Sequence, residues 1–218
     1  MNFAAIKHAA AADGLAIFGA FHPATGDKAP EGVQTLILLG PLEPGYWQRL
    51  KSSPEWGGPD PVDAWSLRVI SALAAQCGAD AYFPFGGPPW HAFYSWAMAS
   101  GSAWASPVGL LVQAEAGLMV SYRGALGFRQ HIALPVQPEA PPCASCATQP
   151  CRTACPAEAL TPTGYDVPKC HAFLDTSRGA DCLSAGCEAR RACPVSKSHG
   201  RLAEQSAHHM RHFHKEPS

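Results

Sequence analysis

Apolar residues follow both strand and helix spacing through the first part of the chain, up to residue 138. Residues 2–12 are rich in alanine and predict a helix that ends at Asp13-Gly14. A short apolar run at residues 15–18 and a longer one, VQTLILL at residues 33–39, predict two strands. Since the second run is almost continuously apolar, we expect it to be buried on both faces in the centre of a sheet.

The clearest predicted helix begins at Asp60 and Pro61 and ends before Gly78. Proline suits the first turn of a helix, and we expect Asp60 to cap it, with Asp63 placed where an acid reaches back toward the cap. Apolar side chains then recur at intervals of three and four residues, which is typical of one buried helix face: Val62, Trp65, Val69, Ile70, Leu73 and Cys77.

Shorter apolar runs predict the remaining elements of this part. We expect a helical turn at residues 46–51, a strand at 81–83, a helix at 90–99, a hairpin of 108–112 and 118–122, and a last strand at 129–134. Helices and strands of this kind, mixed along the chain, predict an α+β fold.

The apolar periodicity stops at four prolines between Pro135 and Pro142, which marks a domain boundary. We therefore expect an α+β domain over residues 1–138. A small loop-rich domain with little regular structure is expected over 139–200, followed by a polar, histidine-rich helix within 201–218.

Composition narrows the class of protein. The net charge of −1 gives no electrostatic footprint for nucleic acid, and no run approaches the roughly 18 apolar residues of a membrane span. The alanine-rich start is interrupted by Asp13-Gly14, so we expect mature cytoplasmic sequence and not a signal peptide. With 20 glycines and 21 prolines, the chain has many positions where backbone can approach a cofactor or partner closely.

Eight of the nine cysteines lie between residues 143 and 193, and only Cys77 lies apart. In the cytoplasm thiols are kept reduced, so we do not expect disulfides. Cysteines clustered in this way indicate metal binding.

The spacing of these cysteines favours iron–sulfur clusters. Cys143-x2-Cys146-x4-Cys151-x3-Cys155-Pro156 is a stretched form of the bacterial ferredoxin run, in which the fourth cysteine binds the other cluster. Crossed ligation predicts two [4Fe-4S] clusters, one bound by Cys143, Cys146, Cys151 and Cys193, the other by Cys155, Cys170, Cys182 and Cys187. Two structural zinc sites of four thiolates each are the alternative that the spacing leaves open.

The run from Cys143 to Pro194 resembles the bicluster ferredoxin segment of epoxyqueuosine reductase and of the corrinoid-dependent reductive dehalogenases. Residues 106–112 (SPVGLLV) and 117–126 (GLMVSYRGAL) resemble the strand pair that precedes these cysteines and a stretch of the cblC-type cobalamin-processing protein. Asp60-Pro61-Val62-Asp63 is also similar to a helix start in the cblC type. The resemblance implies a nitroreductase-like, mixed-sheet N-terminal domain that holds cobalamin, followed by a loop-rich, ferredoxin-like bicluster domain.

Two sites in the N-terminal domain are candidates for catalysis or cofactor binding, and for each the sequence also allows a purely structural role. The resemblance places Asp63 nearest to the aspartate that donates a proton in epoxyqueuosine reductase, but a carboxylate here is also favourable to the helix dipole. Phe85-Gly86-Gly87, with Trp90 and Trp96, could bring backbone and aromatic rings against a flat cofactor. The same residues also suit an ordinary turn beside a core helix.

These observations favour a reductase in which two clusters pass electrons to a corrinoid, or to a flavin, bound by the N-terminal domain. A redox partner protein would supply the electrons. The alternatives are a ferredoxin-like electron carrier and a cobalamin-binding or -processing protein without its own substrate. A corrinoid that co-purifies would separate the carrier from the other two, and turnover of a further molecule would separate those from each other.

Overall fold

The computed structural model describes residues 1–136, 140–161 and 164–214, and the chain divides into two units. Unit 1 comprises Met1–Trp104 and Ser121–Glu139; unit 2 comprises Ala105–Val120 and Ala140–Ser218. Residues 105–120, which the sequence placed with the N-terminal domain, therefore belong to unit 2. The predicted boundary at 138 and 139 lies outside the described residues.

Unit 1 is built on a four-stranded sheet in the order β1-β2-β6-β3. Its strands are β1 (Leu15–Phe21), β2 (Thr35–Pro41), β3 (Asp80–Tyr82) and β6 (Gly124–Phe128). All three strand pairings are antiparallel, so the expected mixed sheet is not what this unit contains. Every residue of β2 is buried, as its continuous apolar run predicts for an inner strand.

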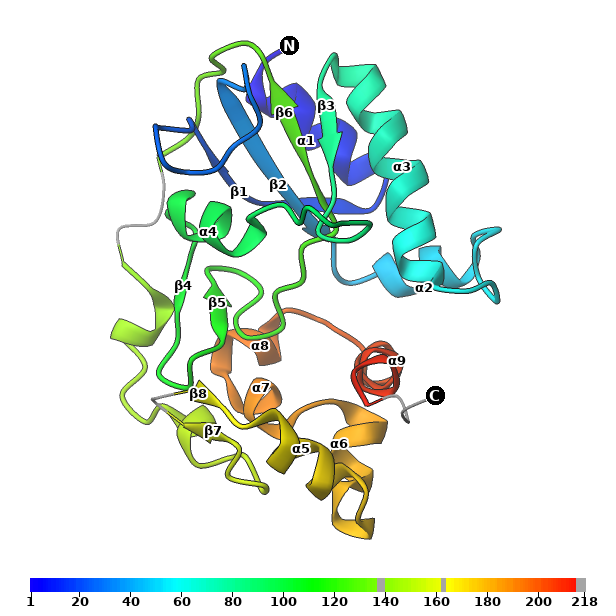
Figure 1. Cartoon of the computed structure of the whole chain (residues 1–218), viewed down its shortest axis with the longest axis vertical. Coiled ribbons are helices and arrows are strands. Elements are labelled where there is room, and N and C mark those ends of the chain that lie inside the picture. Colours follow the sequence, from blue (N-terminus) through cyan, green and yellow to red (C-terminus); the bar gives the residue numbers. More distant parts are fainter. Residues whose placement is uncertain (137–139, 162–163, 215–218) are drawn as a thin grey trace. The chain divides into compact units, whose positions relative to one another are not determined.

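Helices cover both faces of this sheet (Figure 1). The helices of unit 1 are α1 (Phe3–Ala12), α2 (Tyr46–Lys51), α3 (Pro61–Cys77) and α4 (Phe93–Ala99). The helix α1 packs on β1, α3 packs on β3 and β6, and the two helices contact each other, so they share one face. The helix α4 lies on the opposite face. The next element along the chain is the strand β4 (Ala103–Ala105).

The helix α3 confirms the predicted bounds but not the predicted cap. Gly78 ends it in a left-handed conformation, with φ of 68°. Asp60 is itself left-handed, and its side chain accepts no capping hydrogen bond. Its backbone carbonyl accepts the N–H groups of Asp63 and Ala64 instead.

The last strand of the sheet lies five residues earlier than predicted. Residues 129–134 contain no strand, and β6 occupies Gly124–Phe128, paired with both β2 and β3. A Cβ on Gly124 would lie 2.8 Å from Ile70 Cδ1, and one on Gly127 would lie 2.6 Å from the Tyr82 ring. The two glycines are therefore positions of close packing.

Unit 2 contains more regular structure than the sequence predicted. It holds β5 (Leu111–Gln113), the pair β7 (Leu160–Thr161) and β8 (Gly164–Tyr165), α5 (Val167–Leu174), α6 (Ala180–Ala185), α7 (Glu188–Ala192), α8 (Pro194–Ser198) and α9 (Ala203–Phe213). It also holds three single 3-10 turns, η1 (Pro142–Ala144), η2 (Pro150–Arg152) and η3 (Ser177–Gly179). Helices of five to eight residues are too short to show a periodic pattern of apolar residues. Only a capping residue could have indicated them in the sequence. Asp166 is such a residue, because its side chain accepts the Lys169 N–H at 2.9 Å.

The hairpin predicted at 108–112 and 118–122 is reduced to a single bridge. Gln113 and Gly117 exchange both backbone hydrogen bonds, and residues 118–122 form no strand. Among the described residues, no helix is both long and apolar enough to cross a membrane.

Candidate functional site

Four cysteines line one cavity of about 360 Å³ in unit 2. They are Cys143, Cys146, Cys151 and Cys193, the four that crossed ligation assigned to one cluster. Cys143 lies in η1 and Cys151 in η2, while Cys193 lies between α7 and α8. The cavity therefore gathers thiols from positions 50 residues apart in the chain.

Proline sets the backbone at each of these positions. Pro142, Pro150 and Pro194 each occupy the first turn of a short helix next to a cysteine. Proline has no N–H to satisfy there, and its fixed φ suits the start of a helix. At three of the four cysteines of the cavity, a neighbouring proline therefore starts a short helix.

Electrostatics in this cavity disfavour four bare thiolates. Burial, followed by the charges of Cys151, Cys193 and Cys146, raises the pKa of the Cys143 thiol. Burial and then the charges of Cys193 and Cys146 do the same to Cys151. Thiolates this close repel one another unless a cation offsets their charge, and a metal deprotonates its thiol ligands.

The other four cysteines form a second group, in which each interacts electrostatically with at least one other. Cys170 lies in α5, Cys182 in α6, and Cys187 precedes α7. Burial and then the charges of Cys187 and Cys155 raise the pKa of Cys170, against a lowering by the Tyr165 hydroxyl. Burial, and more weakly Cys187, raise the pKa of Cys182 to about 11.

Two hydrogen-bond donors approach sulfur atoms of this second group. The Ala159 N–H donates to Cys155 Sγ at 3.4 Å. Tyr165 hydrogen-bonds Cys170, and its own pKa is raised by burial and then by this thiol. Donors to cysteine sulfur are among the features that set the potential of an iron–sulfur cluster.

No three His, Cys, Asp or Glu side chains of the described residues lie close enough together to hold a single metal ion. The thiols of the first group are spread around a cavity instead of meeting at a point. A tetrahedral zinc site, with Zn–S of about 2.3 Å, needs its sulfurs at about 3.8 Å from one another.

A loop of unit 2, Gly117–Met119, is held against the α7–α9 region by side chains. The Leu118 N–H donates to Ser196 Oγ at 2.9 Å, and Arg190 Nη1 donates to the Leu118 carbonyl at 2.7 Å. Gly117 has φ of 57°, and a Cβ there would lie 2.6 Å from the Ser196 nitrogen. Sequence reasoning missed Ser196 and Arg190, because neither belongs to a motif and both act on residues far along the chain.

Asp63, in the first turn of α3, forms an ion pair with Arg123 in unit 1. Asp63 Oδ1 lies 3.3 Å from Arg123 Nη1, and the Asp63 side chain is 41% exposed while that of Arg123 is 14% exposed. Its partner, the residue just before β6, was not predicted. The described surroundings of Asp63 thus hold a cation, which is compatible with either a structural role or an acid–base role.

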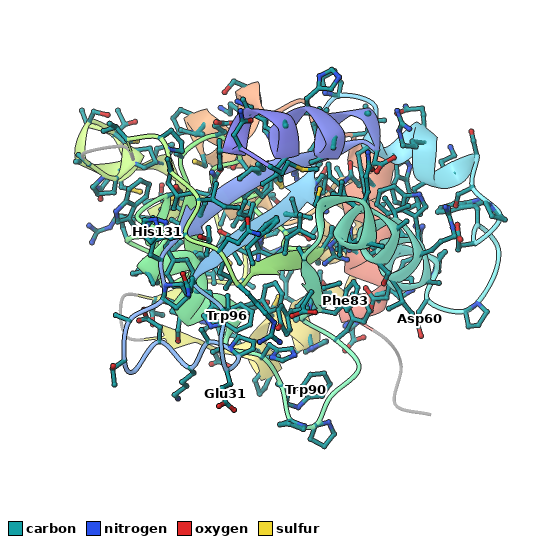
Figure 2. All side chains as sticks on the ribbon, turned by 90° about the horizontal axis from the view of Figure 1, so that it is seen from above. Glu31, Asp60, Phe83, Trp90, Trp96 and His131 are labelled. Atoms are coloured by element: carbon teal, nitrogen blue, oxygen red, sulfur yellow. The ribbon has the colours of Figure 1, made fainter. Side chains whose placement is uncertain are left out.

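The Phe85-Gly86-Gly87 loop carries one strongly exposed aromatic side chain. Trp90 is 65% exposed and extends from the loop between β3 and α4, whereas Trp96 is fully buried (Figure 2). The Trp96 Nε1–H donates to the Asp27 carbonyl at 3.0 Å, so this ring is part of the core and does not face a cofactor. A Cβ on Gly87 would lie 2.9 Å from the Trp90 ring, which explains glycine at this position.

Comparison of the chain with protein-family models, with curated proteins and with solved structures gave no significant match.

Proposed function

We propose that this protein is an iron–sulfur electron-transfer protein, with two [4Fe-4S] clusters held by unit 2. What supports this is one observation: the eight clustered cysteines fall into the two groups of four that crossed ligation requires, one of which lines a single cavity. The resemblance of Cys143–Pro194 to the bicluster segment of epoxyqueuosine reductase points the same way. A ferredoxin-like arrangement of this segment is part of the proposal.

The donor set matches two such clusters in number, and the cavity that the first group lines supports the proposal. A [4Fe-4S] cluster takes one thiolate at each of four irons, so its ligands surround a volume, and the four cysteines of the first group line a cavity of about 360 Å³. Cys143, Cys146, Cys151 and Cys193 would hold one cluster, and Cys155, Cys170, Cys182 and Cys187 the other. The iron would also offset the mutual repulsion of the thiolates.

The clusters would supply one-electron transfer, and the chain supplies binding and tuning of their potentials. The Ala159 N–H and the Tyr165 hydroxyl donate toward sulfur in the second group. Such donors favour the more negative, reduced state. Unit 2 excludes water from part of the first group, since Cys151 and Cys193 are buried.

We propose further that unit 1 is the nitroreductase-like part and binds the electron acceptor, a corrinoid or else a flavin. The support is the exposed Trp90 beside the Gly86-Gly87 loop, together with the resemblance of residues 106–126 to cobalamin-binding relatives. Only the end of that segment, from Ser121, belongs to unit 1. Asp63 would be the proton donor, and a redox partner protein would supply electrons to unit 2.

Metal analysis of protein purified without oxygen tests the cluster proposal. We expect brown protein with about eight iron and eight sulfide per chain, from two clusters of four iron each. Stoichiometric zinc with no visible absorbance would contradict it and would favour two structural zinc sites.

Titration with cob(II)alamin, followed by absorbance and paramagnetic resonance, tests the acceptor. A base-off spectrum that saturates at one equivalent is the expected result. If no spectral change occurs at protein concentrations well above micromolar, the better account is a ferredoxin-like electron carrier. Binding without turnover of any further molecule would favour a cobalamin-processing protein.

A further inference from the structure

Ser106, whose hydroxyl group is buried, is one of the residues that line the cavity of the first cysteine group. The residue is 8% exposed, and its Oγ has no hydrogen-bond partner among the residues that the structure describes. A buried hydroxyl without a partner costs about 1–3 kcal/mol, so such a group in a folded protein calls for an explanation.

The backbone of Ser106 is fully engaged, which fixes the position of its side chain. The Ser106 N–H donates to the Leu110 carbonyl at 2.8 Å, and the Ser106 carbonyl accepts the Gly109 N–H at 3.0 Å. These two bonds close a tight turn through Pro107. The hydroxyl is the polar group of this residue that is left to bind something else.

Besides the cysteines, the cavity is lined by apolar residues such as Pro107, Val112, Leu118 and Val195. It is also lined by the polar residues Ser145, Thr148 and Gln149, and Ser106 Oγ has no hydrogen bond to any of them. Another serine on the wall, Ser145, is exposed and already donates to the Pro142 carbonyl at 3.3 Å. A sulfur atom of a cluster that fills the cavity is an acceptor that could satisfy the Ser106 hydroxyl.

We propose that the Ser106 hydroxyl donates a hydrogen bond to a sulfur atom of the cluster held by Cys143, Cys146, Cys151 and Cys193, and thereby raises its reduction potential. The inference rests on the proposed function, because the acceptor is a sulfur of that cluster. A donor stabilises the reduced cluster more than the oxidised one, since the reduced cluster carries one more negative charge. Ser106 is thus a positioning and tuning residue, not a ligand.

The test compares Ser106→Ala, Ser106→Thr and Ser145→Ala with the unchanged chain, all purified without oxygen. Ser145→Ala makes the same chemical change on the same cavity wall, at a hydroxyl that already has a partner. Iron and sulfide are counted first. The potential of each cluster is then measured by redox titration with paramagnetic resonance, the signals being assigned with Cys143→Ser.

We expect Ser106→Ala to keep its iron and to be about tenfold harder to reduce at this cluster, which is a lowering of about 59 mV for a one-electron couple. Ser106→Thr keeps the hydroxyl and should restore most of the potential. Ser145→Ala and the second cluster should be unchanged. Pulsed paramagnetic resonance in D₂O should also detect a coupled deuteron that Ser106→Ala lacks.

The possible failures are distinguishable. No iron in the unchanged chain would overturn the proposed function itself. Full iron with equal potentials in Ser106→Ala and the unchanged chain would overturn only the role of Ser106. Loss of iron from both Ser106 variants would also overturn it, because the position would then be needed for packing and not for its hydroxyl group.

Discussion

At the scale of single residues, the position of Asp63 agrees both with a structural role in α3 and with the proposed role as proton donor. It stands in the first turn of α3, where its charge favours the helix dipole, and it pairs with Arg123. The ion pair is partly exposed, so water screens it. A test of Asp63 as proton donor requires a replacement that leaves unit 1 folded.

Asp63→Asn should lower the free energy of unfolding by about 0.5–1 kcal/mol, because it removes one partly exposed ion pair and one dipole interaction. Urea unfolding of the metal-loaded protein measures this, and the iron content should stay the same. The matched control is Asp80→Asn, whose partner Arg129 is at 3.5 Å and far more exposed. An equal loss of unfolding free energy in both variants would mean that the burial of Arg123 does not strengthen its ion pair with Asp63.

The cysteines are the residues for which the sequence makes its most specific prediction. Their spacing carries the information, because ligands of one cluster lie close together in the chain except for the crossed one. Ser106, Ser196 and Arg190 carry no such signal. Their roles depend on which distant segments meet, and one sequence does not encode that in a local pattern.

At the scale of elements, β6 is the clearest prediction that was wrong, and α3 the clearest that was right. The helix α3 has 17 residues, a periodic pattern of apolar side chains and a glycine after its last residue. These local features predict the start and the end of a helix well. The five residues of β6, GALGF, contain two glycines that strand propensity disfavours. They are tolerated because Ile70 and Tyr82 fill the space that side chains would occupy.

Gly124→Ala should therefore destabilise unit 1 by about 1–3 kcal/mol, through overpacking against Ile70 Cδ1 and the Tyr82 carbonyl. Thermal unfolding measures the loss. Combining it with Ile70→Val, which removes the Cδ1 atom, should recover part of the loss, so that the two changes are not additive. Gly58→Ala, where the nearest atom is 3.3 Å away, is the control for the change to alanine itself.

The helix α9 should weaken at mildly acidic pH because of His208. Burial, followed by the charges of His212 and Arg211, lowers the pKa of His208 from 6.5 to about 4. The folded state thus favours the neutral imidazole. Its contribution to stability is complete above pH 6.5 and is lost progressively as the pH falls from 6.5 toward 4. Screening at this half-exposed side chain keeps the effect modest.

Urea unfolding of His208→Gln and of the unchanged chain, at pH 7 and pH 5, tests this. The variant should lose less stability between the two pH values than the unchanged chain does. His8→Gln, on the exposed side of α1, should follow the unchanged chain. If His208→Gln loses as much stability between pH 7 and pH 5 as the unchanged chain, His208 does not govern the pH dependence.

At the scale of the whole molecule, the cysteine groups join segments that are distant in sequence. Cys143 and Cys193 line the same cavity although 50 positions separate them, and Cys155, between them in the chain, belongs with the other group. The sequence predicted this division from the ferredoxin run alone. It could not predict that residues 105–120 leave unit 1 to join these cysteines, because their apolar pattern suits either unit.

Cys143→Ser and Cys193→Ser should damage the same cluster, and Cys155→Ser the other, because each group of four would hold one cluster. Paramagnetic resonance of each reduced variant measures which signal is lost. The proposed partition is wrong if the spectrum of Cys193→Ser matches that of Cys155→Ser and differs from that of Cys143→Ser.

The bond between the Leu118 N–H and Ser196 Oγ also bears on the order in which the chain is synthesised. The two residues are 78 positions apart, with the whole cysteine region between them. At about 5–20 residues per second on a ribosome, Leu118 emerges roughly 4–16 s before its partner exists. The two flanks of the loop can fold earlier, because both belong to unit 1, and the loop itself must wait. Unit 1 is therefore interrupted by a loop that is fixed only after Ser196 has been made, and a chain truncated after residue 139 would leave that loop without this contact.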